Sequence, residues 1–577
     1  MAMTMILSMS MTAFAAEASK GTLTVNNTVA GKTLDLYQIF TATKSGDNVA
    51  YTLNSAYEGF FKNNTRIPGS ESLTGEALSE KAIEYVKNQV GTDGKNGTGF
   101  AKEILGWILE NATTVATTHT TATTTDGSTV ISDLAYGYYV VYPLGATDTS
   151  AAPGEQDYTS VASLVSVTGD TSINMKSNYP TVDKKIIPAQ SGSGIKVGAI
   201  VDASWDGSHH MGLEDDENES EDTIAPRGAA DEKKAGDFGI GDTVTYQLTS
   251  KVPDMTGYTS YVFNFKDTLA KGLTFGSITS VKIGDVTINA DTDGTKAENT
   301  YTLTTKNNED GTTEIKIEMN KFLASNANKA GQEIKVTYTA TLNKDAVTGF
   351  DPNTNKATVE YSNKPGTNEK GESEPSIVDV HTFNFTIFKY YLKDKTKTGL
   401  ENAEFELYKA NAAGDAADTD AKINIVDEGA GVYRQATPEE VAATNPKFES
   451  AKIVSDDDGK VLVKGLKAGI YYLRETKAPD GYNLLLDDVK VEIKAVYDDT
   501  TGKLTSYSVD YTYNGTTTTG TAITNKTDSP EVAVENKTGA QLPSTGSKGA
   551  LMVTLAGIVL FGVLTASKVF GKKKANN

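Results

Sequence analysis

The stretch FNFTIFKYYL, residues 383–392, decides the fold class of the chain. Apolar side chains stand at every second position from Phe383, and side chains at i and i+2 lie on the same face of a β-strand. The stretch therefore predicts a strand with one buried face. Lys389 falls in phase with that face, so the same pattern places an amine inside a core.

The same alternation recurs in other parts of the chain, for example in TVTYQLTSKV (243–252), TEIKIEM (313–319) and IKVTYTATL (334–342). It predicts an all-β protein of tandem immunoglobulin-like β-sandwiches arranged as a rod. Residues 78–90 and 99–111 carry apolar residues at helical spacing, which predicts a minor helical insertion in the first domain. The Thr-rich stretch near 113–128 is expected to be a loop.

Three domains are expected between the two chain ends, at 19–178, 179–380 and 381–537. The acidic segment 189–236 interrupts the second domain and is expected to be a disordered loop. Residues 133–139, DLAYGYY, resemble residues 465–471, GLKAGIY, which suggests one sandwich type used twice.

Composition excludes several classes of protein. The 577 residues include no cysteine, so neither disulfides nor thiolate metal sites hold the chain together. A net charge of -21 argues against nucleic-acid binding. No Ser/His/Asp elbow, phosphate loop or metalloprotease motif is present, so we expect no cofactor, no metal and no enzyme.

Both chain ends carry targeting signals. Residues 1–18 resemble a signal peptide cut after Ala15 or Ala18; the usual positive leader is absent, which leaves the true start open. Residues 538–577 are interpreted as a sorting signal, with an apolar run at 550–570 that is long enough to span a membrane and a basic tail at 572–574. The pentapeptide before the run is Leu542, Pro543, Ser544, Thr545 and Gly546.

Strand parity points a lysine, an asparagine and an acid into each of two cores. In the third domain Asn536 is in phase with Val532 and Val534, and Glu475 is in phase with Leu473. The set there is Lys389, Asn536 and Glu475, and the set in the second domain is Lys184, Asn355 and Asp267.

Such a set has a defined chemistry. Desolvation lowers the pKa of lysine and raises that of an acid, so that amine and acid can both be neutral. A neutral amine is a nucleophile, and a protonated carboxyl polarises the Asn carbonyl. Attack of Nζ on Cγ would expel ammonia and leave an amide crosslink. The alternative is that these lysines extend to solvent at strand ends while the asparagines begin turns.

Together these motifs resemble sortase-assembled Gram-positive major (backbone) pilins, with intramolecular isopeptide domains and an LPXTG-type sorting signal. The third domain resembles the collagen-adhesin B-type (SpaA-like, prealbumin-like) fold through its first-strand lysine, YYLRETKAPDGY (471–482) and its final Asn. The resemblance implies that Lys389 bonds Asn536 with Glu475 as the catalytic acid. Asn525 is the competing asparagine.

The second domain resembles the fimbrial isopeptide domain related to the adhesin A-type fold. The resemblance implies that Lys184 bonds Asn355 with Asp267 as the catalytic acid. Lys185 is the competing lysine, but parity puts it on the other face.

The first domain departs from the pattern, so no crosslink is expected there. Its opening strand, Thr22–Asn26, has no lysine, and Tyr142 or Pro143 stands where the third domain has Glu475.

The family's polymerisation lysine lies in a Tyr-Pro-Lys-Asn motif. This chain has Tyr179-Pro180 followed by Thr181, so the acceptor is expected at Lys185, with Lys176 second.

The resemblance implies a non-enzymatic shaft subunit of a cell-surface pilus, secreted and anchored to the cell wall. Its partners would be other copies of itself, a pilin sortase that joins Thr545 to the next subunit, a wall-anchoring sortase and peptidoglycan. Minor pilins and host surface ligands would be further partners. The alternatives are a monomeric wall-anchored adhesin or minor pilin, and a surface enzyme.

Overall fold

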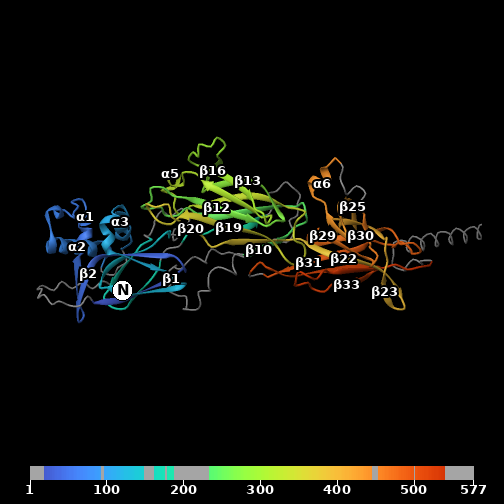
Figure 1. Cartoon of the computed structure of the whole chain (residues 1–577), viewed down its shortest axis with the longest axis horizontal. Helices are drawn as coiled ribbons and strands as arrows, with labels where there is room; N and C mark the ends of the chain where they lie inside the picture. Colours follow the sequence, from blue (N-terminus) through green and yellow to red (C-terminus); the bar gives the residue numbers. More distant parts are fainter. Residues whose placement is uncertain are drawn as a thin grey trace, which may run out of the picture.

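The computed structural model describes residues 19–91, 97–147, 161–175, 179–187, 233–444, 452–498 and 501–539. These residues form three β units, each built from two sheets, that follow one another along the long axis of the molecule (Figure 1). The prediction of tandem β-sandwiches is confirmed. The expected signal peptide, pentapeptide and apolar run lie outside the described residues. Within the described ranges, no helix has the length and apolarity needed to cross a membrane.

The first unit combines a three-stranded and a five-stranded sheet with a helical insertion. The helices predicted at 78–90 and 99–111 are present. The smaller sheet contains β1 (Lys20–Thr28), β5 (Gly127–Ala135) and β8 (Thr171–Asn174); the larger contains β2 (Thr33–Ser45), β3 (Asn48–Leu53), β4 (His119–Thr123), β6 (Gly137–Pro143) and β7 (Ser163–Val167); the helices are η1 (Ser55–Tyr57), α1 (Glu58–Phe61), η2 (Ser70–Ser72), α2 (Gly75–Val90), α3 (Gly97–Glu110), α4 (Ala112–Val115) and η3 (Ala116–Thr118).

The prediction of a loop near 113–128 is wrong. This stretch holds α4, η3, β4 and the start of β5. Threonine is β-branched and fits a pleated strand, and β4 pairs in antiparallel register with β2 from Thr33–Thr123 to Tyr37–His119. The Thr-rich composition of the stretch is therefore compatible with a strand, and the strand forms because β2 is available as its hydrogen-bonding partner.

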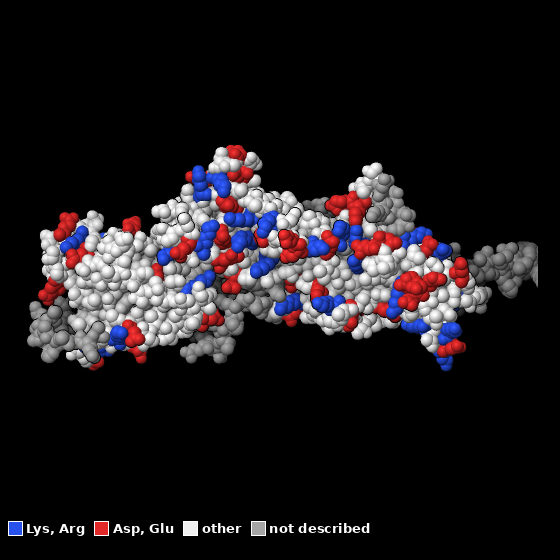
Figure 2. Space-filling model, viewed as in Figure 1, with Lys and Arg blue, Asp and Glu red and all other residues white. Residues whose placement is uncertain are grey.

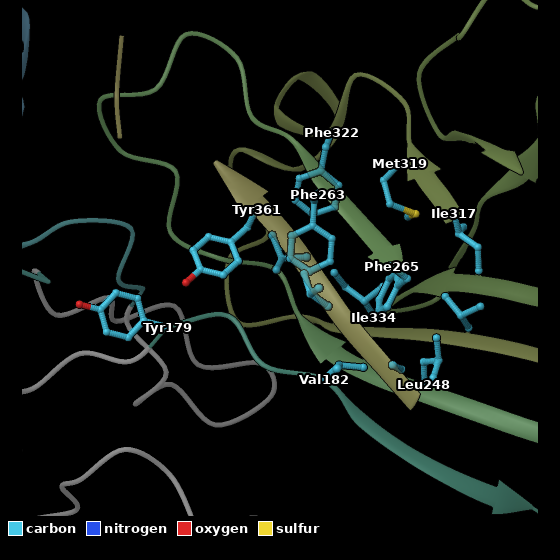
Figure 3. Packing of buried hydrophobic residues seen from close by; sticks show 14 of the residues in the cluster. Tyr179, Val182, Leu248, Phe263, Phe265, Ile317, Met319, Phe322, Ile334 and Tyr361 are labelled. Atoms are coloured by element: carbon cyan, nitrogen blue, oxygen red, sulfur yellow. The ribbon is translucent and has the colours of Figure 1, made fainter. Parts of the chain in front are cut away.

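The second unit packs an eight-stranded sheet on a five-stranded sheet. Phe263, Phe265 and Phe322 lie in its core, where the rings of Phe263 and Phe322 stack at 4.7 Å (Figure 3). The larger sheet contains β10 (Lys233–Asp237), β12 (Phe263–Leu269), β15 (Asn289–Ala290), β16 (Thr300–Asn307), β17 (Thr313–Met319), β19 (Asn353–Ser362), β20 (Lys370–Glu372) and β21 (Ser376–His381); the smaller contains β9 (Asp183–Ile187), β11 (Thr243–Lys251), β13 (Leu273–Ile283), β14 (Val286–Thr287) and β18 (Glu333–Leu342); α5 spans Phe322–Asn326.

The predicted end of the acidic loop at residue 236 is also wrong, because residues 233–236 belong to β10. This strand pairs in parallel with β21 from Lys233–Ile377 to Asp237–His381. It thereby occupies the free edge of β21, whose backbone groups would otherwise lack partners. Residues 189–232 lie outside the described residues.

The third unit packs a six-stranded sheet on a seven-stranded sheet. The six-stranded sheet contains β22 (Phe383–Lys393), β23 (Thr396–Gly399), β26 (Ile425–Gly429), β27 (Val432–Gln435), β29 (Lys460–Leu466) and β34 (Glu531–Glu535); the seven-stranded sheet contains β24 (Glu404–Ala410), β25 (Ala417–Lys422), β28 (Ile453–Val454), β30 (Gly469–Lys477), β31 (Val489–Tyr497), β32 (Leu504–Tyr513) and β33 (Thr516–Thr518); α6 spans Pro438–Ala442.

The similar sequences in the first and third units form similar corners. The hydroxyl of Tyr139 donates to the carbonyl of Ala135 at 2.6 Å, and the hydroxyl of Tyr471 donates to the carbonyl of Lys467 at 2.9 Å. In each case the bond spans four residues and closes the turn that leads into a buried strand.

Hydrogen bonds join consecutive units. The backbone N–H of Ala468 donates to Asp237 at 2.8 Å, and Gln435 donates to the carbonyl of Ile240 at 2.7 Å, so the second and third units are connected. At the other junction the N–H of Asp254 donates to the hydroxyl of Thr147 at 2.6 Å. On the face shown in Figure 2, positive and negative side chains are interspersed over the middle and right of the molecule.

Candidate functional site

The third unit buries a lysine, an asparagine and a glutamate together. Lys389 lies on β22 in phase with Phe385 and Ile387, and all three are fully buried. β34 pairs with β22 in parallel, with Lys389 opposite Val534, and the backbone N–H of Asn536 donates to the carbonyl of Tyr390 at 2.9 Å. The first and last strands of the unit therefore bring the amine and the amide to the same place.

Glu475 reaches this place from the opposite sheet, on β30. Its Oε1 lies 2.9 Å from Lys389 Nζ, and both side chains are fully buried. The same oxygen accepts a hydrogen bond of 3.2 Å from Asn536 Nδ2. Its other oxygen accepts from the backbone N–H of Leu485 at 2.8 Å, which fixes the orientation of the carboxyl group. Strand parity predicted that Lys389, Glu475 and Asn536 point into the same core, as the structure has them.

The carbonyl oxygen of Asn536 has no hydrogen-bond partner among the described residues. Because the oxygen and nitrogen of an amide are assigned from hydrogen-bond networks, a flipped Asn536 would turn this oxygen toward Glu475. A protonated Glu475 could then donate to it. This arrangement would polarise the Asn carbonyl for attack by the amine.

The second unit holds the corresponding set, split between its two sheets. Lys184 lies on β9 at the edge of the five-stranded sheet, while Asp267 on β12 and Asn355 on β19 belong to the eight-stranded sheet. Their exposed fractions are 0%, 3% and 0%. Lys184 Nζ donates a hydrogen bond to Asp267 Oδ2. As in the third unit, the carbonyl oxygen of the Asn has no partner among the described residues.

Sequence reasoning missed Tyr338, which connects all three members of this set. Its hydroxyl accepts from Lys184 Nζ, accepts from Asn355 Nδ2 at 2.8 Å and donates to Asp267 Oδ2 at 2.8 Å. Tyr338 is in phase with the apolar residues of β18, so parity places it in the core. No sequence signal indicated that β18 lies in the same sheet as β9, separated from it only by β11.

The environment lowers the pKa of both lysines. Burial lowers the pKa of Lys184 to about 8, with Asp267 opposing the shift, and burial lowers the pKa of Lys389 to about 8, with Glu475 opposing it. Burial also raises the pKa of Asp267, against the opposing effect of Lys184. In the second unit, both directions favour a neutral amine beside a neutral acid. This is the protonation state in which an amine can attack an amide.

A set of the same residue types, in which Asn264 is buried but the lysine is exposed, lies on the outer face of the second unit. Glu360 accepts a hydrogen bond from Asn264 at 2.7 Å and pairs with Lys370 at 3.2 Å. The Lys370 side chain is 42% exposed. Here the amide and the lysine lower the pKa of Glu360 despite partial burial, so the carboxylate stays ionised. Burial, rather than the residue types, distinguishes the two inner sets.

The competing residues lie elsewhere. Asn525 is exposed and bonds Asp528 and Thr527 within its own turn. Lys185 is half-buried on the other face of β9, where it pairs with Gln247 of β11. Lys176 and the pentapeptide 542–546 lie outside the described residues. In the first unit Tyr142 is buried in β6, which ends at Pro143.

Comparison with family models identifies two of the three units. Residues 240–365 match the Gram-positive pilin backbone subunit 2, Cna-B-like domain, and residues 386–508 match the SpaA prealbumin-like fold domain. A curated relative is the type 2 fimbrial subunit of Actinomyces naeslundii, 25% identical over 351 residues. The match covers 58% of this chain and 58% of the relative, so the chain spans little more than half of the relative's length. The chain is homologous to Gram-positive backbone pilins.

Solved structures with similar arrangements include two major pilins. The T6 backbone pilin of Streptococcus pyogenes is 16% identical, with a TM-score of 0.43, and the match covers 91% of this chain and 100% of that one. The major pilin SpaA of Corynebacterium diphtheriae is 15% identical, with a TM-score of 0.41, and the match covers 89% of this chain and 99% of that one. TM-scores below 0.5 support no further conclusion about this chain.

The variant Asn355→Ala removes the amide that Lys184 could attack, so the Lys184 amine stays free to titrate. Its lowered pKa should then appear in the pH dependence of the free energy of unfolding. The unfolded chain binds more protons than the folded chain between pH 8 and the ordinary lysine pKa of about 10.4, so stability should rise with pH in that window. The expected gain over the whole window is about 3 kcal/mol by the same relation. Chemical denaturation of the second unit measures it.

The matched control is Lys184→Met in the Asn355→Ala background, which should remove the slope. An equal slope in both variants would contradict the lowered pKa.

Proposed function

We propose that this chain, a homologue of Gram-positive backbone pilins, is the structural shaft subunit of a covalently polymerised cell-surface pilus. The observation that carries the proposal is the pair of buried amine, amide and acid sets. In the third unit, the set joins the first strand to the chain segment after the last strand. A shaft must resist pulling along its axis, and a covalent tie between these strands would prevent a unit from unzipping.

The proposed tie is an isopeptide bond in each of the two units. The neutral amine of Lys389 attacks Asn536 Cγ, Glu475 donates a proton to the amide oxygen and later assists departure of ammonia, and an amide remains. Lys184, Asn355 and Asp267 act in the same way. The geometry that supports this is the 2.9 Å approach of Lys389 to Glu475 and the hydrogen bond of Asn536 to the same oxygen. Each reaction occurs once, so the chain is not an enzyme in the usual sense.

Polymerisation and anchoring are proposed from the chain ends. Residues 1–18 direct export, and the run at 550–570 holds the chain at the membrane until a pilin sortase cleaves between Thr545 and Gly546. Thr545 is then joined to a lysine of the next copy, for which the sequence suggests Lys185 or Lys176. A second sortase attaches the finished polymer to peptidoglycan. The chain would thus act at the cell surface, bound to the wall.

Wall extracts of the source bacterium test the polymer directly. A shaft subunit should give a ladder of species, each heavier by one subunit, that persists in boiling detergent and reacts with antibody against this chain. A single band at the mass of one subunit would indicate a monomeric wall-anchored adhesin instead and would overturn the proposal.

Intact-mass measurement of the recombinant ectodomain tests the crosslinks. The expected mass is that of the sequence less two molecules of ammonia, because each bond expels one. Asn536→Ala should lose only one ammonia, while Asn525→Ala should still lose two, since Asn525 bonds only within its own exposed turn. A mass equal to the plain sequence would refute both bonds.

Tyr338→Phe should slow the reaction in the second unit without preventing it. The change removes a hydroxyl that holds acid and amide at 2.8 Å each, and a hydrogen bond of this kind contributes about 1 kcal/mol, or roughly a five- to ten-fold change in rate. Ammonia loss is followed by mass spectrometry during cell-free synthesis. The Lys389 reaction in the same chain is the internal control and should keep its rate. Unchanged rates at both sites would exclude a role for Tyr338.

A further inference from the structure

Lys32 has an unusual position at the junction of the first and second units. Its backbone is held on both sides by Thr124: the N–H of Lys32 donates to Thr124 Oγ1 at 2.8 Å, and the N–H of Thr124 donates to the carbonyl of Lys32 at 2.8 Å. Gly31, with φ of 73°, turns the chain just before it. The residue therefore leaves the first unit from a fixed point.

The Lys32 amine reaches onto the second unit. It donates to the hydroxyl of Tyr361 at 3.3 Å and to the carbonyl of Glu372 at 3.4 Å. It also lies 4.9 Å from the ring centre of Tyr179 and 5.9 Å from that of Tyr361. Figure 3 shows these two tyrosines at one side of the cluster, with both hydroxyls pointing away from Phe263. The amine thus rests on aromatic faces while its residue stays only half-buried.

Three lysines have a lowered pKa in the part of the chain that the structure describes, namely Lys32, Lys184 and Lys389. For Lys32 the cause is burial, opposed by the charge of exposed Glu374. Lys184 and Lys389 each have a buried acid and an Asn at hand. The contacts of the Lys32 amine are instead a hydroxyl, a backbone carbonyl and two rings, and they include no side-chain amide or acid.

We propose that Lys32 is the amine that accepts Thr545 of the neighbouring subunit during polymerisation. This inference rests on the proposed function. The sortase cysteine first displaces Gly546 and holds Thr545 as a thioester. The lone pair of Lys32 Nζ attacks that carbonyl carbon, the carbon–sulfur bond breaks, and the thiolate leaves. The proton lost from Nζ returns to the thiolate, so the net change is one amide exchanged for another.

A desolvated amine suits this step. An ordinary lysine, with a pKa of about 10.4, is neutral in only about one molecule in a thousand at pH 7.4, whereas attack requires the neutral form. Burial lowers the pKa of Lys32, which favours the neutral amine, and the two tyrosine rings supply no competing electrophile. Lys185, the residue suggested by sequence, instead extends from the middle of β9, beside Gln247.

The test compares Lys32→Arg with Lys185→Arg in the full chain, expressed with its own sortase in a strain lacking the natural gene. Arginine keeps the cation over the two rings but does not acylate. The expected result is loss of the ladder in Lys32→Arg and an unchanged ladder in Lys185→Arg. The reverse pattern would overturn the inference. Thermal unfolding of the Lys32→Arg ectodomain checks that the junction is intact.

Junction mapping in the unmodified polymer gives an answer that does not depend on any variant. Proteolysis and mass spectrometry should find the peptide ending in Thr545 linked to the peptide containing Lys32. A junction at any other lysine refutes the inference but leaves the shaft function standing, whereas a wild-type chain without a ladder removes the proposed function itself.

Discussion

The structure depends on the protonation state of an amine that is buried beside an acid. An isolated ammonium or carboxylate is costly to bury, and the cost falls when both groups become neutral. Lys184 and Lys389 are completely buried, and each lies against a buried carboxyl group. The fold tolerates these pairs because a β core supplies the hydrogen bonds: Tyr338 in the second unit and the Leu485 backbone in the third.

The set on the outer face of the second unit, whose lysine is exposed, shows why the residue types alone are insufficient. Asn264, Glu360 and Lys370 are in contact just as the inner sets are, yet here hydrogen bonds and nearby lysine charges lower the pKa of Glu360 despite partial burial and keep it ionised. An ionised acid cannot donate a proton to an amide, and a solvated lysine remains charged. The same three residue types therefore form an ordinary ion pair on the outer face and, in the cores, the sets for which we propose the crosslinking reaction.

Strand parity explains how much could be predicted. Period-two alternation is local, so the inward direction of Lys389, Glu475 and Asn536 could be derived from short stretches of sequence. Tyr338 and Lys32 could not be found this way, because their roles depend on which sheet or unit faces them. The errors at 113–128 and 233–236 have the same origin: each of these stretches contains a strand because a distant edge, β2 or β21, pairs with it.

Viewed together, the three lysines with lowered pKa differ in where their electrophile lies. Where a unit supplies both acid and amide, the proposed reaction is closed within the unit and strengthens it against pulling. Where burial lowers the pKa of an amine whose contacts include no side-chain amide, as at Lys32, the proposed reaction is with a neighbouring subunit. One physical effect, desolvation of lysine in a cysteine-free chain, would then serve both the strength of each subunit and the joining of subunits. The amide and the acid beside the amine would decide between the two outcomes.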